Sequence, residues 1–84
     1  MLPRVKDVRV LKDYELLLTF DDGAVKTFDV SPYLDKGKFS ELKEPDVFYS
    51  VIPFLGSIQW SNGLDLCPDT LYIDGTDVKT GEHF

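Results

Sequence analysis

Hydrophobic and polar positions alternate most regularly between residues 14 and 30. The first half of this stretch places its large apolar side chains on one face: Tyr14, Leu16, Leu18 and Phe20. An Asp-Asp-Gly sequence at residues 21–23 then interrupts the alternation. A three-residue turn with Gly23 in the left-handed region pairs Leu16 with Phe28 and collects the apolar side chains of both arms on one face. A two-residue turn would place Phe28 opposite Leu17 and mix the faces, so the pattern predicts a β-hairpin with the longer turn.

A further strand is predicted before this hairpin. Valines alternate with charged residues over residues 4–11, and residues 12–13 make a short connection into the hairpin. Val5 falls on the opposite parity from Val8, which indicates a bulge near residues 6–7. The N-terminal part is therefore predicted to be a three-stranded antiparallel meander.

Two short helices are predicted after the meander. Ser31 belongs to a residue type that caps helices, Pro32 suits the first helical position, and Gly37 is expected to end the helix. A second helix is predicted over residues 44–49, with Pro45 at its first position. Neither is long enough to be stable alone, so both are expected to place aromatic side chains on the open face of the hairpin.

A second hairpin is predicted further along the chain. Residues 51–55 are apolar but contain Pro53, which confines them to an edge strand or a connection. Residues 57–60 read as a strand, and the Ser-Asn-Gly turn that follows repeats the chemistry of the first turn. With the same three-residue geometry, Ile58 faces Leu66.

The C-terminal part completes the predicted domain. A helical turn is expected over residues 68–72 with Asp69 as its cap, and residues 74–84 read as a loose polar tail. We expect a single domain over residues 1–84, ordered over about residues 3–73. Its fold class is α+β: a small antiparallel β-sheet, made of the N-terminal three-strand meander and the C-terminal hairpin, covered by short helices.

Charge and composition narrow the function classes. The net charge of −6 comes from 15 acidic and 9 basic residues. Because binding to a phosphate backbone needs clustered Lys and Arg, no direct nucleic acid binding is expected. The acidic surface either serves solubility alone or also steers a basic partner toward the protein. The single cysteine, Cys67, excludes an internal disulfide, no signal-like segment follows Met1, and no apolar stretch is long enough to span a membrane. The sequence therefore predicts a cytoplasmic protein.

The residues needed for catalysis are sparse. The sequence has one histidine, His83 in the tail, and one cysteine, Cys67, so a working pair requires the tail to fold back. No serine lies in a nucleophile-elbow pattern, and no glycine-rich phosphate loop is present. The acidic stretch at residues 74–77 lacks the ligand spacing of a calcium loop. We therefore expect no catalytic residues, no metal and no cofactor, and predict that the protein is not an enzyme.

A candidate interaction or ligand surface is predicted around the second turn. It comprises Trp60, Asn62, Asp65, Asp69 and Tyr72. Two carboxylates lined by aromatic rings are typical of an acid/base cleft. The simpler interpretation is that Trp60 belongs to the core, that Asp69 caps a turn and that Asp65 faces solvent. A concave pocket that joins the two aspartates to both aromatic rings would favour the cleft.

The segment around this turn resembles a known family. Residues 58–72, with the sequence IQWSNGLDLCPDTLY, resemble the signature end of a small bacterial family catalogued as domain of unknown function 2442. The upstream hairpin, residues 14–30, and the Phe48 helix resemble it as well, so the similarity covers roughly residues 3–73. The resemblance implies a compact α+β fold on an antiparallel sheet and no established activity.

The resemblance also carries expectations about partners. Some relatives have a helix-turn-helix domain after this module, and we expect that part to be absent from this chain, which ends at Phe84. Members resemble one half of small two-protein units arranged like toxin–antitoxin pairs. The leading hypothesis is a non-enzymatic protein-interaction module, antitoxin-like, with a small basic protein as partner. The alternatives are a homo-oligomer formed through a strand edge, and a small ligand-binding protein or enzyme that uses Trp60, Asp65, Asp69 and Tyr72.

Overall fold

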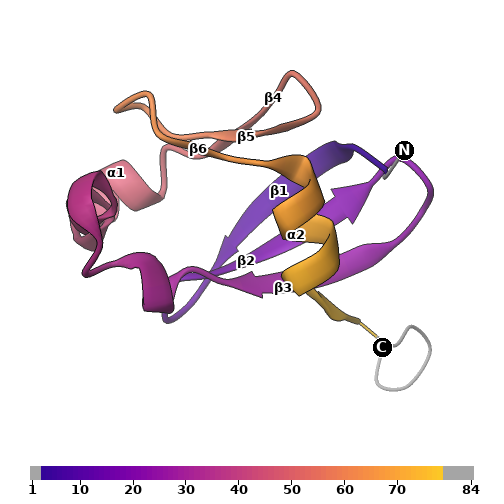
Figure 1. The fold of residues 1–84 in the computed structure, drawn as a ribbon, viewed down its shortest axis with the longest axis horizontal. Helices are drawn as coiled ribbons and strands as arrows, with labels where there is room; N and C mark the ends of the chain where they lie inside the picture. Colours follow the sequence, from indigo (N-terminus) through magenta and orange to yellow (C-terminus); the bar gives the residue numbers. More distant parts are fainter. Residues whose placement is uncertain (1–2, 79–84) are drawn as a thin grey trace.

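The computed structural model describes residues 3–78 and shows an α+β fold with two antiparallel sheets, in agreement with the predicted class (Figure 1). The first sheet has the order β1-β2-β3-β7, formed by β1 (Val5–Leu11), β2 (Glu15–Phe20), β3 (Val25–Asp29) and β7 (Thr76–Asp77). The second has the order β4-β5-β6, formed by β4 (Ile52–Phe54), β5 (Ser57–Gln59) and β6 (Asp65–Leu66). The helical elements are the 3₁₀ helices η1 (Ser31–Tyr33) and η2 (Gly37–Lys43) and the α-helices α1 (Pro45–Phe48) and α2 (Pro68–Asp74).

The first hairpin has the predicted register. Leu16 lies opposite Phe28, and the Phe20 N–H donates to the Ala24 carbonyl at 2.8 Å. Gly23 has φ of +90°, the left-handed conformation that this turn requires. The predicted bulge is also present, since the pairing of β1 with β2 shifts between Val5 and Asp7. The hydrophobic alternation and the glycine were therefore sufficient to define three strands.

The second hairpin repeats the turn of the first. The Trp60 N–H donates to the Leu64 carbonyl at 2.9 Å, and Gly63 has φ of +86°. Ile58 lies opposite Leu66, as predicted. Residues 52–54 pair with β5 as an edge strand, which is one of the two roles that the proline allowed. The hairpin thus belongs to a second sheet of its own rather than extending the first.

The helix ends differ from prediction. Ser31 does not cap η1; the Asp29 carboxylate instead accepts hydrogen bonds from the Ser31 N–H at 2.9 Å and from its Oγ at 2.7 Å. An aspartate two residues upstream thus forms the local turn that was assigned to the serine. Gly37 begins η2, which was not predicted, rather than ending the first helix. The helix with Pro45 at its start is present as α1.

The C-terminal elements also correct the prediction. Asp69 lies in the first turn of α2 without capping it, and Cys67 occupies the N-cap position with no side-chain hydrogen bond. The loose tail predicted from residue 74 is wrong for Thr76 and Asp77, which pair with β3 as β7. This pairing is stabilised by an ion pair of 2.7 Å between Asp77 and Lys26, whose side chain is only 10% exposed. The remaining tail, residues 79–84, lies outside the described part of the chain.

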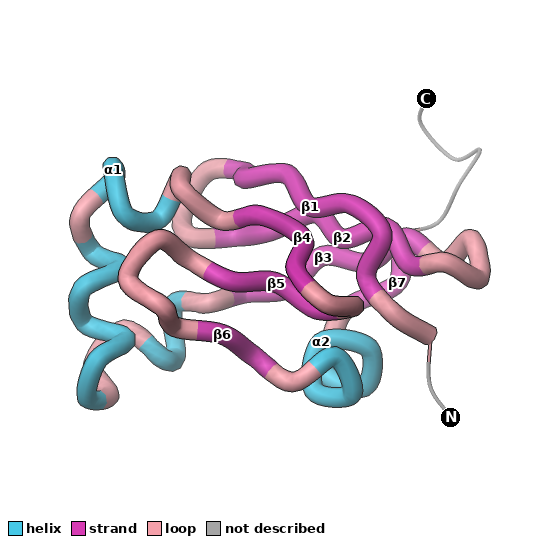
Figure 2. Tube along the Cα trace, turned by 90° about the horizontal axis from the view of Figure 1, so that it is seen from above, coloured by secondary structure: helices cyan, strands magenta, loops and turns pink. Residues whose placement is uncertain are grey.

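The core lies between the two sheets. Figure 2 shows the β4-β5-β6 sheet lying across one face of the larger sheet, with α1 at one end and α2 beside β6. The side chains that fill this space come from both sheets, from every helix except η1 and from connecting residues: Val5, Leu16, Leu18, Phe20, Phe28, Val30, Leu34, Leu42, Phe48, Ile58, Trp60, Leu66 and Leu71. Within residues 3–78 the structure has no helix long and apolar enough to cross a membrane.

Candidate interaction surfaces

Trp60, the centre of the predicted surface, belongs to the core. Its side chain is 1% exposed and stacks beside Phe48, with ring centroids 6.3 Å apart. The indole N–H donates to the Phe48 carbonyl at 3.2 Å, so its one polar group is satisfied inside the protein. A ligand cannot reach this ring in the folded state, and the simpler interpretation of Trp60 is confirmed.

The other four predicted residues are divided between the second turn, β6 and α2, where Asp69 and Tyr72 lie one turn apart. Asn62 closes the second turn, where its Oδ1 accepts from the Leu64 N–H at 3.1 Å. Asp65 and Asp69 are exposed. Tyr72 donates its hydroxyl to Asp22 in the first turn at 3.0 Å, and this hydrogen bond is the main cause that raises the pKa of Tyr72.

These positions do not form the concave site that the cleft hypothesis requires. A hollow of about 290 Å³ includes Asp65 together with Phe54, Leu55 and Cys67, but neither Trp60 nor Tyr72 lines it. The residue types of the two aspartates and the two aromatic residues suggested a cleft. Residue type does not tell how deeply a side chain is buried in the fold. The ligand-binding and enzymatic alternative therefore lacks the geometry on which it depended.

Exposed apolar side chains gather instead on a segment that the sequence marked only as an edge. Four of the five large hydrophobic side chains that are exposed among the described residues lie within residues 49–55: Tyr49 at 65%, Ile52 at 51%, Phe54 at 42% and Leu55 at 81%. We call residues 49–55 the apolar segment. The fifth, Ile73, lies on α2. Single exposed hydrophobic residues are common on protein surfaces, whereas a contiguous group of them is a sign of an interaction site.

The apolar segment forms an outer edge of the second sheet. All three residues of β4 are exposed, and β4 pairs only with β5. Ile52 lies opposite Gln59, and Phe54 opposite Ser57, so both apolar side chains lie on the same face of the sheet. Pro53 lies between them and has no N–H to offer an added strand. A proline inside an apolar stretch was the one sequence signal that could have indicated this exposure.

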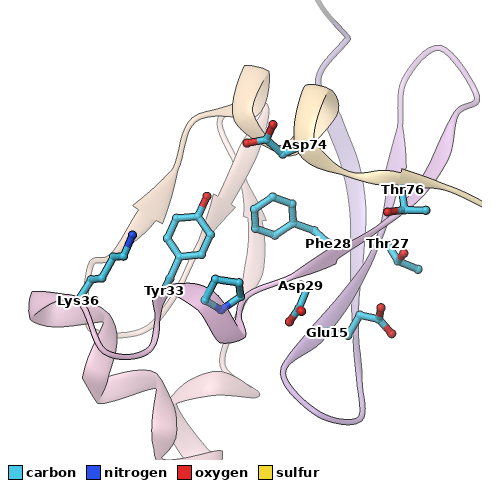
Figure 3. Close-up of a pocket in the computed structure, with 9 residues that line it drawn as sticks. Glu15, Thr27, Phe28, Asp29, Tyr33, Lys36, Asp74 and Thr76 are labelled. Atoms are coloured by element: carbon cyan, nitrogen blue, oxygen red, sulfur yellow. The ribbon is translucent and has the colours of Figure 1, made fainter.

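A second surface lies on the first sheet, beside β3. A pocket of about 400 Å³ opens where β3, η1 and the end of α2 meet, and Figure 3 shows the side chains around it. Its main lining residues are Glu15, Phe28, Asp29, Tyr33, Lys36 and Asp74. We call this pocket the acidic groove, because three of these side chains are carboxylates and one is an amine. A neighbouring hollow shares Glu15 and Asp29 with it and extends toward Asp13.

Catalytic chemistry gains no support from the described residues. Cys67 is exposed, whereas a structural cysteine beside Pro68 would be expected to be at least half-buried. His83, the other member of the catalytic pair considered from the sequence, lies outside the part of the chain that the structure describes. Across residues 3–78, no three His, Cys, Asp or Glu side chains are grouped closely enough to hold a metal ion. The question of enzymatic activity thus rests on the sequence argument alone.

The fold and its surfaces define a small two-sheet α+β protein with one apolar edge and one acidic edge. The chain belongs to the family described as "Protein of unknown function (DUF2442)", whose model matches residues 5–75. This confirms the family that the sequence resembled. Comparisons with curated proteins and with solved structures found no significant match.

Proposed function

We propose that this protein is a non-enzymatic interaction module that binds a small basic protein through the apolar segment. The single observation that supports this most is the concentration of exposed Tyr49, Ile52, Phe54 and Leu55 side chains on the edge strand β4 and the residues that flank it. Burial of one such side chain in an interface contributes about 1.5–3 kcal/mol. A partner that covers two or three of them gains several kcal/mol, which offsets part of the entropy lost on association.

The mode of binding follows from the strand itself. Strand addition to β4 would lack one donor, because Pro53 contributes no N–H. The proposed partner therefore contacts β4 mainly through side chains, with Ile52 and Phe54 inserted into an apolar depression on its surface. The same argument disfavours a homo-oligomer formed by pairing two β4 edges.

Charge supports a basic partner. The chain carries a net charge of −6, which attracts a positively charged protein at long range and repels a second copy of itself. Asp65 is exposed beside Phe54 and Leu55, so part of this negative charge lies next to the apolar segment. Arg4 is the nearby exception, since its guanidinium donates to the Leu55 carbonyl at 3.2 Å.

The resemblance to two-protein units gives this proposal its biological form. In that setting the module would act as the antitoxin-like member, and the basic partner would be the product encoded beside it. Covering the partner's active surface would require tight binding and no catalysis by this chain. This role is the proposal that the following experiment addresses.

The test is affinity capture of the tagged chain from the cells in which it is native, read by mass spectrometry. The variant Ile52→Glu/Leu55→Glu places two charges in the apolar segment, where desolvating them would oppose binding. The matched control is Ile73→Glu, which changes an equally exposed hydrophobic residue on α2. All these positions are exposed, so each substitution should alter the free energy of unfolding by less than about 0.5 kcal/mol.

The proposal expects one basic protein to be retained by the unmodified chain and by Ile73→Glu. Retention by the double variant should fall at least about ten-fold, the equivalent of about 1.4 kcal/mol. Equal retention by all three chains would contradict the assigned surface. Capture of no specific protein by the unmodified chain, together with a monomer at all concentrations, would contradict the interaction role itself.

A further inference from the structure

The acidic groove lies where one edge of the first sheet is left open. Strand β7 pairs only with Lys26 and Thr27, so it does not extend along β3 as far as Asp29. The Val30 N–H donates to the Tyr14 carbonyl, and the Phe20 N–H donates to the Ala24 carbonyl, which fixes the even-numbered residues of β3 as those bonded to β2. The odd-numbered residues therefore direct their backbone groups to the outer edge, and the Val78 N–H donates to the Val25 carbonyl there. Asp29, two residues beyond Thr27, directs its backbone N–H and C=O to the part of the edge that β7 does not cover.

The side chains at this open edge carry an unfavourable charge pair. Glu15 and Asp29 are cross-strand partners of β2 and β3. They form a pair without mutual backbone hydrogen bonds, and such pairs bring their side chains closest together. Like charges directly opposite each other destabilise a sheet. The two ion pairs found among residues 3–78, Lys26–Asp77 and Lys43–Asp35, involve neither carboxylate. Lys12 lines the neighbouring hollow together with both carboxylates but forms no ion pair with either of them.

The opposite wall of the groove is apolar and aromatic. The rings of Phe28 and Tyr33 lie 5.9 Å apart, and Pro32 lies beside them. In Figure 3, Tyr33 stands at one side of the groove, with Asp29 and Glu15 below Phe28 and Asp74 above it. Lys36 is the one cationic side chain of the lining, and its Nζ lies 5.9 Å from the centre of the Tyr33 ring. The groove thus already has a cation beside its aromatic wall, although it makes no ion pair there.

We propose that the acidic groove binds an extended peptide segment that carries an arginine or a lysine. The segment adds to β3 beside Asp29, continuing the position that β7 occupies next to Thr27. Its cationic side chain lies between Glu15 and Asp29, and the aliphatic part of that side chain packs on Tyr33 and Pro32. The bound cation replaces repulsion between the two carboxylates with attraction to both. This surface is separate from the apolar segment, so the inference goes beyond the proposed function and stands whether or not that segment has a partner.

The test is a titration of the ¹⁵N-labelled full chain, followed by amide chemical shifts. The probe is a capped Thr-Val-Arg-Val-Thr peptide, and the comparison peptide has glutamine in place of arginine. Free arginine serves as a third ligand, since it offers the cation without a strand. We expect saturable shifts at Thr27, Asp29 and Thr76 with the arginine peptide at millimolar concentration, and weaker binding at higher salt, because the Debye length falls below about 10 Å above 0.1 M.

Two variants test the carboxylates directly. Glu15→Gln keeps the side-chain volume, and Asp29→Asn retains the Oδ1 acceptor that the Ser31 N–H needs. Each substitution should lower the affinity for the arginine peptide by about three- to ten-fold. The matched controls Asp65→Asn and Asp69→Asn remove the same charge elsewhere on the chain and should weaken it less than two-fold, about the size of a long-range effect. Lys36→Gln removes the competing cation and should strengthen binding.

Each remaining outcome overturns the proposal or one of its parts. Absence of saturable shifts with the arginine peptide overturns it entirely. Equal binding of the glutamine peptide would show that the cation does not contribute to binding. Equal binding of free arginine removes the role of the strand edge and leaves a site for a small cation. Equal weakening by the groove variants and by the control variants would show only a general effect of charge.

Discussion

The two sheets of this protein contain the same turn but end in opposite kinds of edge. In the first hairpin the Asp22 side chain accepts from the Ala24 N–H at 2.9 Å, and in the second the Asn62 side chain accepts from the Leu64 N–H at 3.1 Å. The glycines that follow have φ of +90° and +86°. Beyond the hairpins, the outer edge of β3 is acidic and partly covered by β7, whereas the outer edge of β4 is apolar and interrupted by proline.

This difference shows that the turn defines the pairing, while the neighbouring segments define what the edge can bind. At β3 the open position beside Asp29 retains its backbone donor and acceptor, so a strand with a cationic side chain fits there. At β4 the proline removes a donor, and the exposed side chains of Ile52 and Phe54 are left to make the contacts. The predictions below test that division of roles.

The largest effect is expected in the core, directly after β5, rather than at the edge of the second sheet. Trp60→Ala removes a fully buried ring and the hydrogen bond that it donates to the Phe48 carbonyl, and should lower the free energy of unfolding by about 3–5 kcal/mol. Leu55→Ala, in the same region but 81% exposed, should change it by less than about 0.5 kcal/mol. Urea unfolding of both variants measures the difference. Comparable losses would show that the apolar segment supports the fold and is not free for a partner.

The next effect concerns the partial cover of β3. Asp77→Asn removes the carboxylate partner of Lys26, whose side chain is nearly buried, and should cost about 1–2 kcal/mol. The value is below that of a fully buried pair because the Asp77 side chain is 76% exposed. Amide hydrogen exchange at Thr27 should become faster as β7 separates from β3.

The control for this prediction is Asp35→Asn. It breaks the ion pair with Lys43, in which both side chains are largely exposed, and should change stability by less than about 0.5 kcal/mol. If Asp77→Asn had no larger effect than Asp35→Asn, then β7 would not be held by its ion pair.

A smaller effect of opposite sign is expected at the acidic edge. Glu15→Gln removes the repulsion between Glu15 and Asp29 and should raise the free energy of unfolding by about 0.2–1 kcal/mol. The same variant should lower the affinity for the arginine peptide, so the free energy of unfolding and the affinity change in opposite directions. Thermal unfolding at low ionic strength measures the gain. A loss of stability would mean that the free chain already compensates the pair of carboxylates.

The smallest effect is a change in titration that links the first turn to α2. The neutral Tyr72 hydroxyl donates to Asp22, and this bond raises the pKa of Tyr72 because ionisation destroys it. The contribution of this hydrogen bond to the free energy of unfolding is complete below the pKa that Tyr72 has in the unfolded chain. It is lost as the pH rises through the higher pKa that Tyr72 has in the folded chain. In an NMR titration of ring-labelled tyrosine, Asp22→Asn should lower the pKa of Tyr72. An unchanged pKa would exclude Asp22 as its cause.

The sequence was informative wherever short-range geometry decides the structure. Alternating side chains and a glycine at the third turn position were enough to predict the pairings of Leu16 with Phe28 and of Ile58 with Leu66. Both turns are local, and a shift by one residue would have moved every apolar side chain to the wrong face. The family resemblance, which was noted on the segments around these turns, was confirmed by a family model that matches residues 5–75.

The sequence was silent wherever distant segments decide the structure. A two-residue strand such as β7 has no detectable pattern, and the ion pair that accompanies its pairing joins residues that are 51 positions apart. Tyr72 and Asp22 meet across 50 positions, a contact that the sequence did not predict. The depth of Trp60 and the exposure of Ile52 depend on how the two sheets pack, and residue type alone cannot reveal that.

The measurement that tests the central claim most directly compares two variants in the same capture experiment from native cells. Ile52→Glu/Leu55→Glu changes the apolar edge, and Glu15→Gln/Asp29→Asn changes the acidic edge. The account predicts that a basic protein partner is lost, by at least about ten-fold, with the first variant and is largely retained with the second. Retention of that partner by the first variant, or its loss with the second alone, would contradict the assignment of the apolar segment as the main binding surface.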